Sequence, residues 1–236
     1  MMTILEAIDR RCSRRSYLDQ PIDPAAREAL QQMIHDFNAR EGLTIRLLDG
    51  AGPSFQGILN DRGVFDGVNT VIALCGRSAL PELHERLGYY GELLALEATR
   101  HGLGTCWAGG TFDRGDPVYA LPEGEEMACL LTAGYCPPDK SAAEVAFYEW
   151  VHIQMKTADE MMDCDRTPPD WFLRGVEAVT KAPSGMHQQP AVVCWQNGEI
   201  FIRGAGGADL GIAKAHFDLA AGGRFAFGPD GRFTKN

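Results

Sequence analysis

The densest group of chemically capable side chains is the stretch RRCSRRSY, Arg10 to Tyr17, which places four arginines within six residues. The chain as a whole is acidic, with 32 Asp and Glu residues against 22 Lys and Arg. Guanidinium groups offer planar, bidentate donors to phosphate oxygens, and the Ser13 hydroxyl can add another donor. Cations are also favourable at a helix C-terminus without any ligand. The stretch therefore predicts a phosphate clamp, with favourable helix-end placement as the alternative.

A second candidate is the glycine-rich segment GLGTCWAGG, residues 102–110. Closely spaced glycines let a ligand approach backbone N–H groups, which can hydrogen-bond the edge of a planar heterocycle. The alternative is structural, with Gly102 ending a helix and the pair Gly109 and Gly110 ending a strand. The segment is not a dinucleotide fingerprint, because it lacks the third glycine and follows a helix instead of opening one.

The third candidate is the loop APSGMHQQP, residues 182–190, which is bounded by prolines at both ends. Its polar side chains are Ser184, His187, Gln188 and Gln189. Polar groups on a loop of fixed shape form a platform for a polar ligand chain, and the alternative is an ordinary polar connection.

Several other kinds of site are excluded. His84 and Glu85 lack the second histidine of a zinc-protease helix, since position 88 is glycine, and no GxSxG or GK[ST] phosphate-loop motif is present. We therefore assign no catalytic side chain and no metal ligand. The following histidines are interpreted as ordinary helix residues: His35, His84, His101, His152 and His216.

Composition narrows the class of protein further. A length of 236 residues with 45% hydrophobic residues suffices for an ordinary globular core, and a net charge of −10 disfavours nucleic-acid binding. The seven cysteines are scattered without a CxxC pair, which indicates reduced thiols. No apolar run approaches the ~18 residues of a membrane span. We expect a cytoplasmic protein without a membrane or nucleic-acid partner.

The elements of the first part follow from periodicity. Residues 4–8 have helical spacing, which puts the arginines at or just past a helix C-terminus, and Asp23 with Pro24 begins a second helix. Residues 43–49 and 68–75 read as strands, the latter central. A long core-facing helix is predicted over residues 81–101. Residues 104–110 are predicted to form a short strand with a glycine turn, and residues 127–135 a further central strand.

The second part begins with a connector over residues 136–170 that contains one helix at most. A helix over 171–181, an Asn-Gly hairpin over 191–204 and a helix from 210 with Asp209 as its N-cap are predicted. This order repeats the first part loosely. The sequence thus predicts an α+β fold whose central antiparallel or mixed sheet is flanked by helices. Its two similar halves, residues 1–140 and 141–236, pack as one unit.

In this order, the three segments resemble the nitroreductase family of FMN enzymes. The match to the family's N-terminal R-R-S-x-R-x-F/Y pattern comprises Arg11, Cys12, Ser13, Arg15 and Tyr17. GELLALEATRHGLGTCWAGG, residues 91–110, is similar to the family's central helix and glycine turn. APSGMHQQP is similar to its P-S-x-x-N-x-Q-P loop. Residues 209–221 are similar to a helix of a subgroup with single-chain internal duplication.

This resemblance implies a noncovalent FMN that takes electrons from NAD(P)H and passes them to a nitro compound, a quinone or another small acceptor. Arg11 and Arg15 would meet the FMN phosphate, with Cys12 and Ser13 beside it. The other cofactor-binding residues implied are Trp107, Ala108, Gly109 and Gly110 at the flavin ring, and Pro183, Ser184, His187 and Gln189 in the loop.

In the wider family one subunit supplies the arginine and glycine elements and the other supplies the loop. Here the loop occurs only in the second half, so we expect a monomer that imitates a dimer, with a homodimer as the alternative. Cys12, His187 and Ala191 depart from the family pattern, which usually has Arg or His, Asn and an aromatic residue at these places. The competing function is a flavin- or nucleotide-binding sensor or storage protein without turnover.

Overall fold

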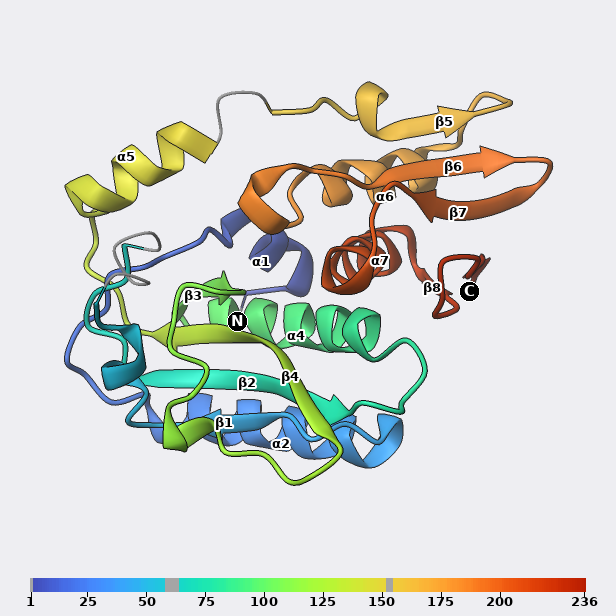
Figure 1. Ribbon diagram of the computed structural model, residues 1–236. Helices are drawn as coiled ribbons and strands as arrows, with labels where there is room; N and C mark the ends of the chain where they lie inside the picture. Colours follow the sequence, from blue (N-terminus) through green and yellow to red (C-terminus); the bar gives the residue numbers. More distant parts are fainter. Residues whose placement is uncertain (1, 58–63, 152–154) are drawn as a thin grey trace.

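The computed structural model describes residues 2–57, 64–151 and 155–236 (Figure 1). Helix α1 (Ile4–Arg10) begins with a capping box, in which Thr3 and Glu6 satisfy each other's backbone N–H groups. Arg11 is the C-cap of this helix. The arginine stretch therefore begins in the last turn of α1 and continues beyond it, as the sequence predicts.

The first sheet has four antiparallel strands in the order β1-β2-β4-β3. Their bounds are β1 (Arg46–Leu48), β2 (Thr70–Arg77), β3 (Gly104–Ala108) and β4 (Glu125–Gly134). Strand β2 is buried along seven of its eight residues, which fits its predicted central place. Helices α2 (Pro24–Glu41) and α4 (Leu83–Arg100) share one core with Ile72, Leu74 and Leu131 on one face of this sheet.

The opposite face is covered by loops and two short 3-10 helices, η1 (Gly52–Phe55) and η2 (Pro117–Tyr119). Their aromatic side chains Phe55, Phe112 and Tyr119 pack with Val71 and Leu130 of the sheet. In the described part of the first half, the long helices α2 and α4 thus lie on one face, and loops with short 3-10 helices lie on the other.

The second sheet has three strands, β5 (Met162–Cys164), β6 (Val192–Gln196) and β7 (Glu199–Arg203). Strand β6 pairs in parallel with β5 and antiparallel with β7. The β6–β7 turn is the predicted Asn-Gly pair: Asn197 and Gly198 have φ of 53° and 84°, as a tight two-residue hairpin requires. Helices α6 (Asp170–Thr180) and α7 (Gly207–Ala221) share a core with the second sheet. A separate two-stranded sheet is formed by β8 (Gly223–Phe225) and β9 (Phe233–Lys235).

Helices α4 and α7 lie side by side between the two sheets (Figure 1). Glycines allow the two helix backbones to approach closely. A Cβ added to Gly88 would clash with the Ala208 backbone, and one added to Gly211 would clash with the Glu85 carbonyl oxygen. Three buried polar pairs then join the helices. They are Glu85 with Lys214 at 2.7 Å, Tyr89 with Asp218 at 3.0 Å and Glu92 with His216 at 2.9 Å.

Two local predictions were wrong. The stretch 136–170 contains the expected helix, α5 (Ala142–Val151), but also the 3-10 helix η3 (Asp159–Met161) and strand β5, whose pairing partner lies about 30 residues later. Asp209 does not cap α7, because the helix begins earlier with Gly206 as its N-cap. The Asp209 carboxylate instead accepts from the backbone N–H of Gly185 at 3.2 Å.

The predicted fold class is confirmed: helices flank an antiparallel four-stranded sheet and a mixed three-stranded one. The likeness of the two halves, and the boundary between residues 140 and 141, stay predictions. In the part of the chain that the structure describes, no helix combines the length and the apolar character needed to cross a bilayer.

We predict that Gly211→Ala lowers the free energy of unfolding by about 2 kcal/mol, even though alanine is the better helix former. The new Cβ would lie 2.6 Å from the Tyr89 backbone nitrogen and closer still to the Glu85 oxygen, and backbone atoms inside a packed helix cannot yield. Urea denaturation measures the change. The matched control is Gly110→Ala, whose Cβ would meet open space, so a comparable loss in both variants would contradict the close helix contact.

Candidate functional site

The structure brings the first two sequence motifs together. Ser13 and Thr105 form a parallel β-bridge, and the Arg14 N–H donates to the Thr105 carbonyl at 2.9 Å. The arginine stretch therefore runs alongside β3, the strand that leads into the glycine turn at Gly109. Residues almost a hundred positions apart thus lie side by side at the β3 edge of the first sheet.

The arginines of this stretch contact different neighbours. Arg11 turns inward, is 7% exposed, and lies 3.5 Å from the Glu92 carboxylate. Arg14 donates to the carbonyl of Pro137 at 2.9 Å, whereas the Arg15 guanidinium lies 4.1 Å from the centre of the Phe147 ring. Arg10 is exposed. Their shared sequence position therefore does not give them a shared environment.

Helix α5 reaches this stretch through one buried carboxylate, Glu144. Its Oε1 accepts from the backbone N–H groups of Arg15 at 2.5 Å and Ser16 at 3.2 Å. Its Oε2 accepts from the Ser141 N–H, while Ser141 Oγ accepts from the Glu144 N–H, which completes a capping box. Burial raises the Glu144 pKa, but these backbone hydrogen bonds outweigh it and lower the pKa to about 2.

Sequence reasoning missed Glu144, although a signal was present. Residues 141–144 read SAAE, the S-x-x-E pattern of a capping box ahead of an apolar run. Glu144 is the buried residue of α5, and Val145, Tyr148 and Trp150 on the same helix stay exposed. The helix is therefore attached to the arginine stretch mainly by hydrogen bonds and by the Phe147 ring over Arg15.

The glycine turn is open and firmly anchored. Gly109 and Gly110 are exposed, and an added Cβ on either would meet no atom within 4 Å. The Arg114 guanidinium holds the turn, since it donates to the carbonyls of Gly109 at 2.7 Å and Met127 at 2.8 Å. Arg114 is a second residue that the sequence did not reveal. The space directly beside both glycines is therefore open.

Several buried polar atoms at or near β3 have no hydrogen-bond partner among the described residues. Nε and Nη1 of Arg11 and Oγ1 of Thr105 are buried, and none forms a hydrogen bond to any residue that the structure describes. Beside them, the Trp107 indole N–H donates to Glu92 at 2.9 Å, and Ala108 is buried. Buried donors normally have partners, so Arg11 retains capacity for a ligand atom or a water molecule.

The third motif forms a loop with an unusual backbone. Residues 185–187 make the 3-10 helix η4 (Gly185–His187), and Met186, His187 and Gln189 have φ between 46° and 52°. Non-glycine residues rarely adopt this left-handed region, and where they do a binding site is often near. Ser184 Oγ accepts from the Gln189 N–H at 3.0 Å, which closes the loop on itself.

Within this loop the candidate residues differ in exposure. Gln189 is buried, donates to the Thr180 carbonyl at 2.9 Å and accepts from the Lys156 N–H at 2.8 Å, so it fixes the loop. Pro183 is also buried. Ser184 and His187 are half-buried, and His187 Nε2 lies 3.0 Å from the Met155 sulfur. Gln188 is exposed, so Ser184, His187 and Gln188 are the polar loop side chains that a ligand can reach.

The loop begins next to α1 of the same chain. Lys181 Nζ lies 2.7 Å from the Asp9 carboxylate, and Ala178 shares a small core with Ala7 and Ile8. Asp9 precedes the arginine stretch and Lys181 precedes the loop. The two motifs thus begin close together, at the contact between α1 and the end of α6.

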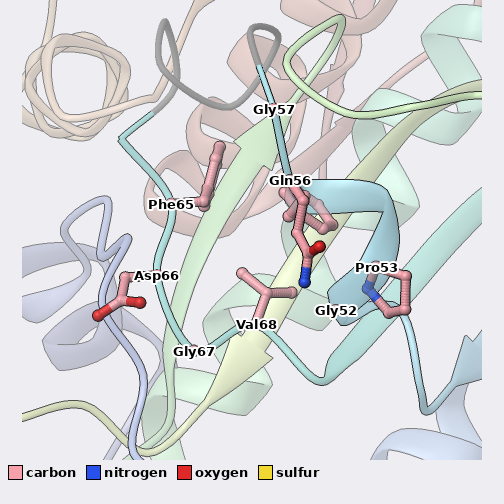
Figure 2. Close-up of a pocket in the computed structure, with 9 residues that line it drawn as sticks. Gly52, Pro53, Gln56, Gly57, Phe65, Asp66, Gly67 and Val68 are labelled. Carbon is pink, nitrogen blue, oxygen red and sulfur yellow. The ribbon is translucent and has the colours of Figure 1, made fainter.

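A cavity of about 460 Å³ lies near Arg15 of the arginine stretch. Figure 2 shows that its lining comes from two segments, residues 52–57, which include η1, and residues 65–68. Phe65 of this lining lies 6.0 Å from the Arg15 guanidinium, and the backbone of Asp66 hydrogen-bonds Arg15 and Tyr17. The cavity therefore adjoins Arg15, on the face of the first sheet that η1 and η2 cover.

Other chemistry receives no support from the geometry. Across residues 2–57, 64–151 and 155–236, no three His, Cys, Asp or Glu side chains gather in a way that could hold a metal ion. Of the five histidines expected to be ordinary, His152 lies outside the described residues. His216 departs from the expectation, because it is fully buried and paired with Glu92.

The chain belongs to the nitroreductase family described as "Putative TM nitroreductase", which matches residues 3–221. Its backbone is similar to that of a "putative nitroreductase" from Thermotoga maritima, with a TM-score of 0.68, 19% identity, and coverage of 98% of this chain and 92% of that one. An FMN-dependent nitroreductase from Clostridium difficile R20291 has a TM-score of 0.47, 14% identity, and coverage of 61% and 95%. None of the curated proteins matches the chain.

We predict that Glu144→Gln lowers the free energy of unfolding by about 2 kcal/mol at neutral pH, because hydrogen bonds to a charged group are lost. The folded-state pKa of about 2 lies below the ordinary value of 4.5, so the carboxylate stabilises the protein above pH 4.5 and the contribution disappears as the pH falls towards 2. Urea unfolding across this range measures it. Glu149→Gln, an exposed site on the same helix, is the control, and a pH-independent difference would contradict the assignment.

Proposed function

We propose that this protein is an FMN-dependent oxidoreductase, in which NAD(P)H reduces the flavin and the flavin reduces a small acceptor such as a nitro compound or a quinone. One observation carries the proposal: in a chain of the nitroreductase family, the arginine stretch lies against the strand that ends in an open glycine turn. Two of the three motifs that the resemblance assigns to the cofactor are therefore neighbours.

The residues present fit a phosphorylated flavin. Arg11 has two buried guanidinium nitrogens without hydrogen-bond partners among the described residues, and such donors suit phosphate or carbonyl oxygens. Ser13 and Cys12 follow it at the edge of β3. The backbone of Gly109 and Gly110 is accessible for the rim of a planar ring. A bound flavin would supply the hydride and electron transfer.

The protein's own part is then to bind and orient. Arg11 and Arg15 provide positive charge, the glycine turn provides backbone donors, and Ser184 and His187 of the loop provide polar side chains. We assign no side chain the role of general acid or base. The Phe147 ring over Arg15 limits the directions from which a ligand can reach that guanidinium.

We further propose that one chain builds one such site from both of its halves. The ion pair between Asp9 and Lys181 and the shared core of Ala178 with α1 support this, because both bring the start of the loop to the start of the arginine stretch. A homodimer in which each loop serves the neighbouring subunit is the alternative. The mass of the FMN-loaded protein in solution, with one flavin per monomer, tests it.

The experiment that tests the function is the visible spectrum of the purified protein with FMN, before and after addition of NADH or NADPH without oxygen. We expect a bound flavin spectrum that bleaches with one of the two nucleotides and recovers when a quinone or nitro compound is added. Bound flavin that does not bleach would favour a sensor or storage protein. A protein that binds no FMN would remove the proposal.

We predict that the double substitution Arg11→Ala and Arg15→Ala weakens FMN binding by several kcal/mol, since hydrogen bonds to charged groups contribute ~1.5–3 kcal/mol each. Fluorescence titration of FMN measures the dissociation constant. The single variant Arg15→Ala is measured alongside, because Arg11 also faces Glu92.

The control for this prediction is Arg10→Ala, which removes an exposed arginine of the same stretch outside the family pattern. Its FMN affinity should stay within about threefold of the parent protein. A folded double variant that binds FMN as tightly as the parent would show that these arginines do not hold the phosphate.

A further inference from the structure

Glu92 of α4 stands where four elements meet. Its Oε1 lies 2.9 Å from Nε2 of His216 on α7 and 3.5 Å from Nε of Arg11 at the end of α1. Its Oε2 accepts from the Trp107 indole N–H of β3 at 2.9 Å. Glu92 and His216 are both 0% exposed. Residues of both halves of the chain, the start of the arginine stretch and strand β3 thus meet at one carboxylate.

The hydrogen bonds of His216 fix the number of protons that it carries. Nδ1 lies 2.9 Å from the Ala178 carbonyl oxygen, which can only accept, so Nδ1 must be the donor. Nε2 faces the Glu92 carboxyl, and one proton must lie between these two atoms. The Arg11 guanidinium and the Trp107 N–H both stabilise the ionised carboxylate. Both contacts favour the arrangement in which the shared proton lies on His216 as an imidazolium.

The cluster then has a net charge of +1. Arg11 and His216 each carry one positive charge, and Glu92 carries one negative charge. The next charged groups along α4 and α7 have partners of their own, Glu85 with Lys214 and Asp218 with Tyr89. Within this cluster, Arg11 Nε and Nη1 are buried and have no hydrogen-bond partner among the described residues.

We propose that Glu92 and His216 are positioning residues of the flavin site: Glu92 fixes the Arg11 guanidinium, and the protonated His216 leaves a positive charge that favours the reduced, more negative flavin. This inference rests on the proposed function. It adds a specific division of roles, in which one residue sets the geometry of Arg11 and the other sets the charge. Neither residue needs to touch the flavin or the substrate.

The protonation of His216 is tested in the protein without flavin. Nitrogen-15 NMR of the histidine rings, assigned by comparison with His216→Gln, should show both nitrogens of His216 protonated at neutral pH. One protonated and one bare nitrogen would show that Glu92 holds the proton, so that His216 would be neutral and Glu92 would not be the counter-charge that fixes Arg11. That result would overturn the proposal whether or not the protein binds FMN.

Two variants separate the roles. His216→Gln keeps a donor towards Glu92 and removes one positive charge, so the reduction equilibrium of bound FMN should shift at least tenfold towards the oxidised form, about 30 mV for a two-electron couple. Its FMN affinity should change little. Glu92→Gln retains the bonds to Trp107 and to a neutral His216, so the charge of +1 is preserved while Arg11 loses its anchor. We expect FMN affinity to fall at least tenfold with little change in potential.

The control is Glu97→Gln, which alters a carboxylate of the same helix that pairs with Arg100 and His101 instead. Potentials are measured by equilibration with a reference dye, affinities by fluorescence titration, and folding by thermal melting. Variants that melt earlier but keep the parental potential and affinity would show that the pair is only structural, and the inference would be wrong. Failure of the parent protein itself to bind FMN would instead remove the proposed function, and with it this role of the pair.

Discussion

The close approach of α4 and α7 is the constraint on which the rest of the molecule depends. Glycines at positions 88 and 211 let the two backbones touch, and polar side chains on both helices are buried by that contact. A buried charge that loses its partner is strongly destabilising. Only the register that pairs Glu85 with Lys214 and Glu92 with His216 avoids this cost. The helix contact therefore selects one relative placement of the two sheets.

This placement determines what the second half can contribute to the site. Helix α6 packs on α7 and ends beside α1, where Lys181 pairs with Asp9. The loop of residues 182–190 begins there, and Asp209 in the first turn of α7 holds it through the Gly185 N–H. Burial raises the pKa of Asp209 and the Gly185 N–H lowers it, with a net upward shift. The loop is thus tied at two places to elements that the helix contact has already positioned.

Local patterns in the sequence predicted local structure well. The apolar spacing of α4, the continuous apolar run of β2 and the Asn197–Gly198 hairpin each depend on a few neighbouring residues. Strand β5 was missed because its three residues are a strand only through parallel pairing with β6. Glu92 and His216 are 124 residues apart, and no local signal marks either one. The Glu144 capping box was readable in advance, but its contact with Arg15 was not.

The arginine stretch shows why residue type alone leaves a site undetermined. Guanidinium chemistry is the same at all four positions, yet Arg14 and Arg15 are engaged by the α5 region and Arg11 by Glu92. Glu92 divides its oxygens between Trp107 and His216, so it approaches Arg11 as a counter-charge and forms no hydrogen bond with it. Arg11 is consequently held in place while two of its donors stay available. The proposed phosphate site would thus combine a fixed cation with unused donors.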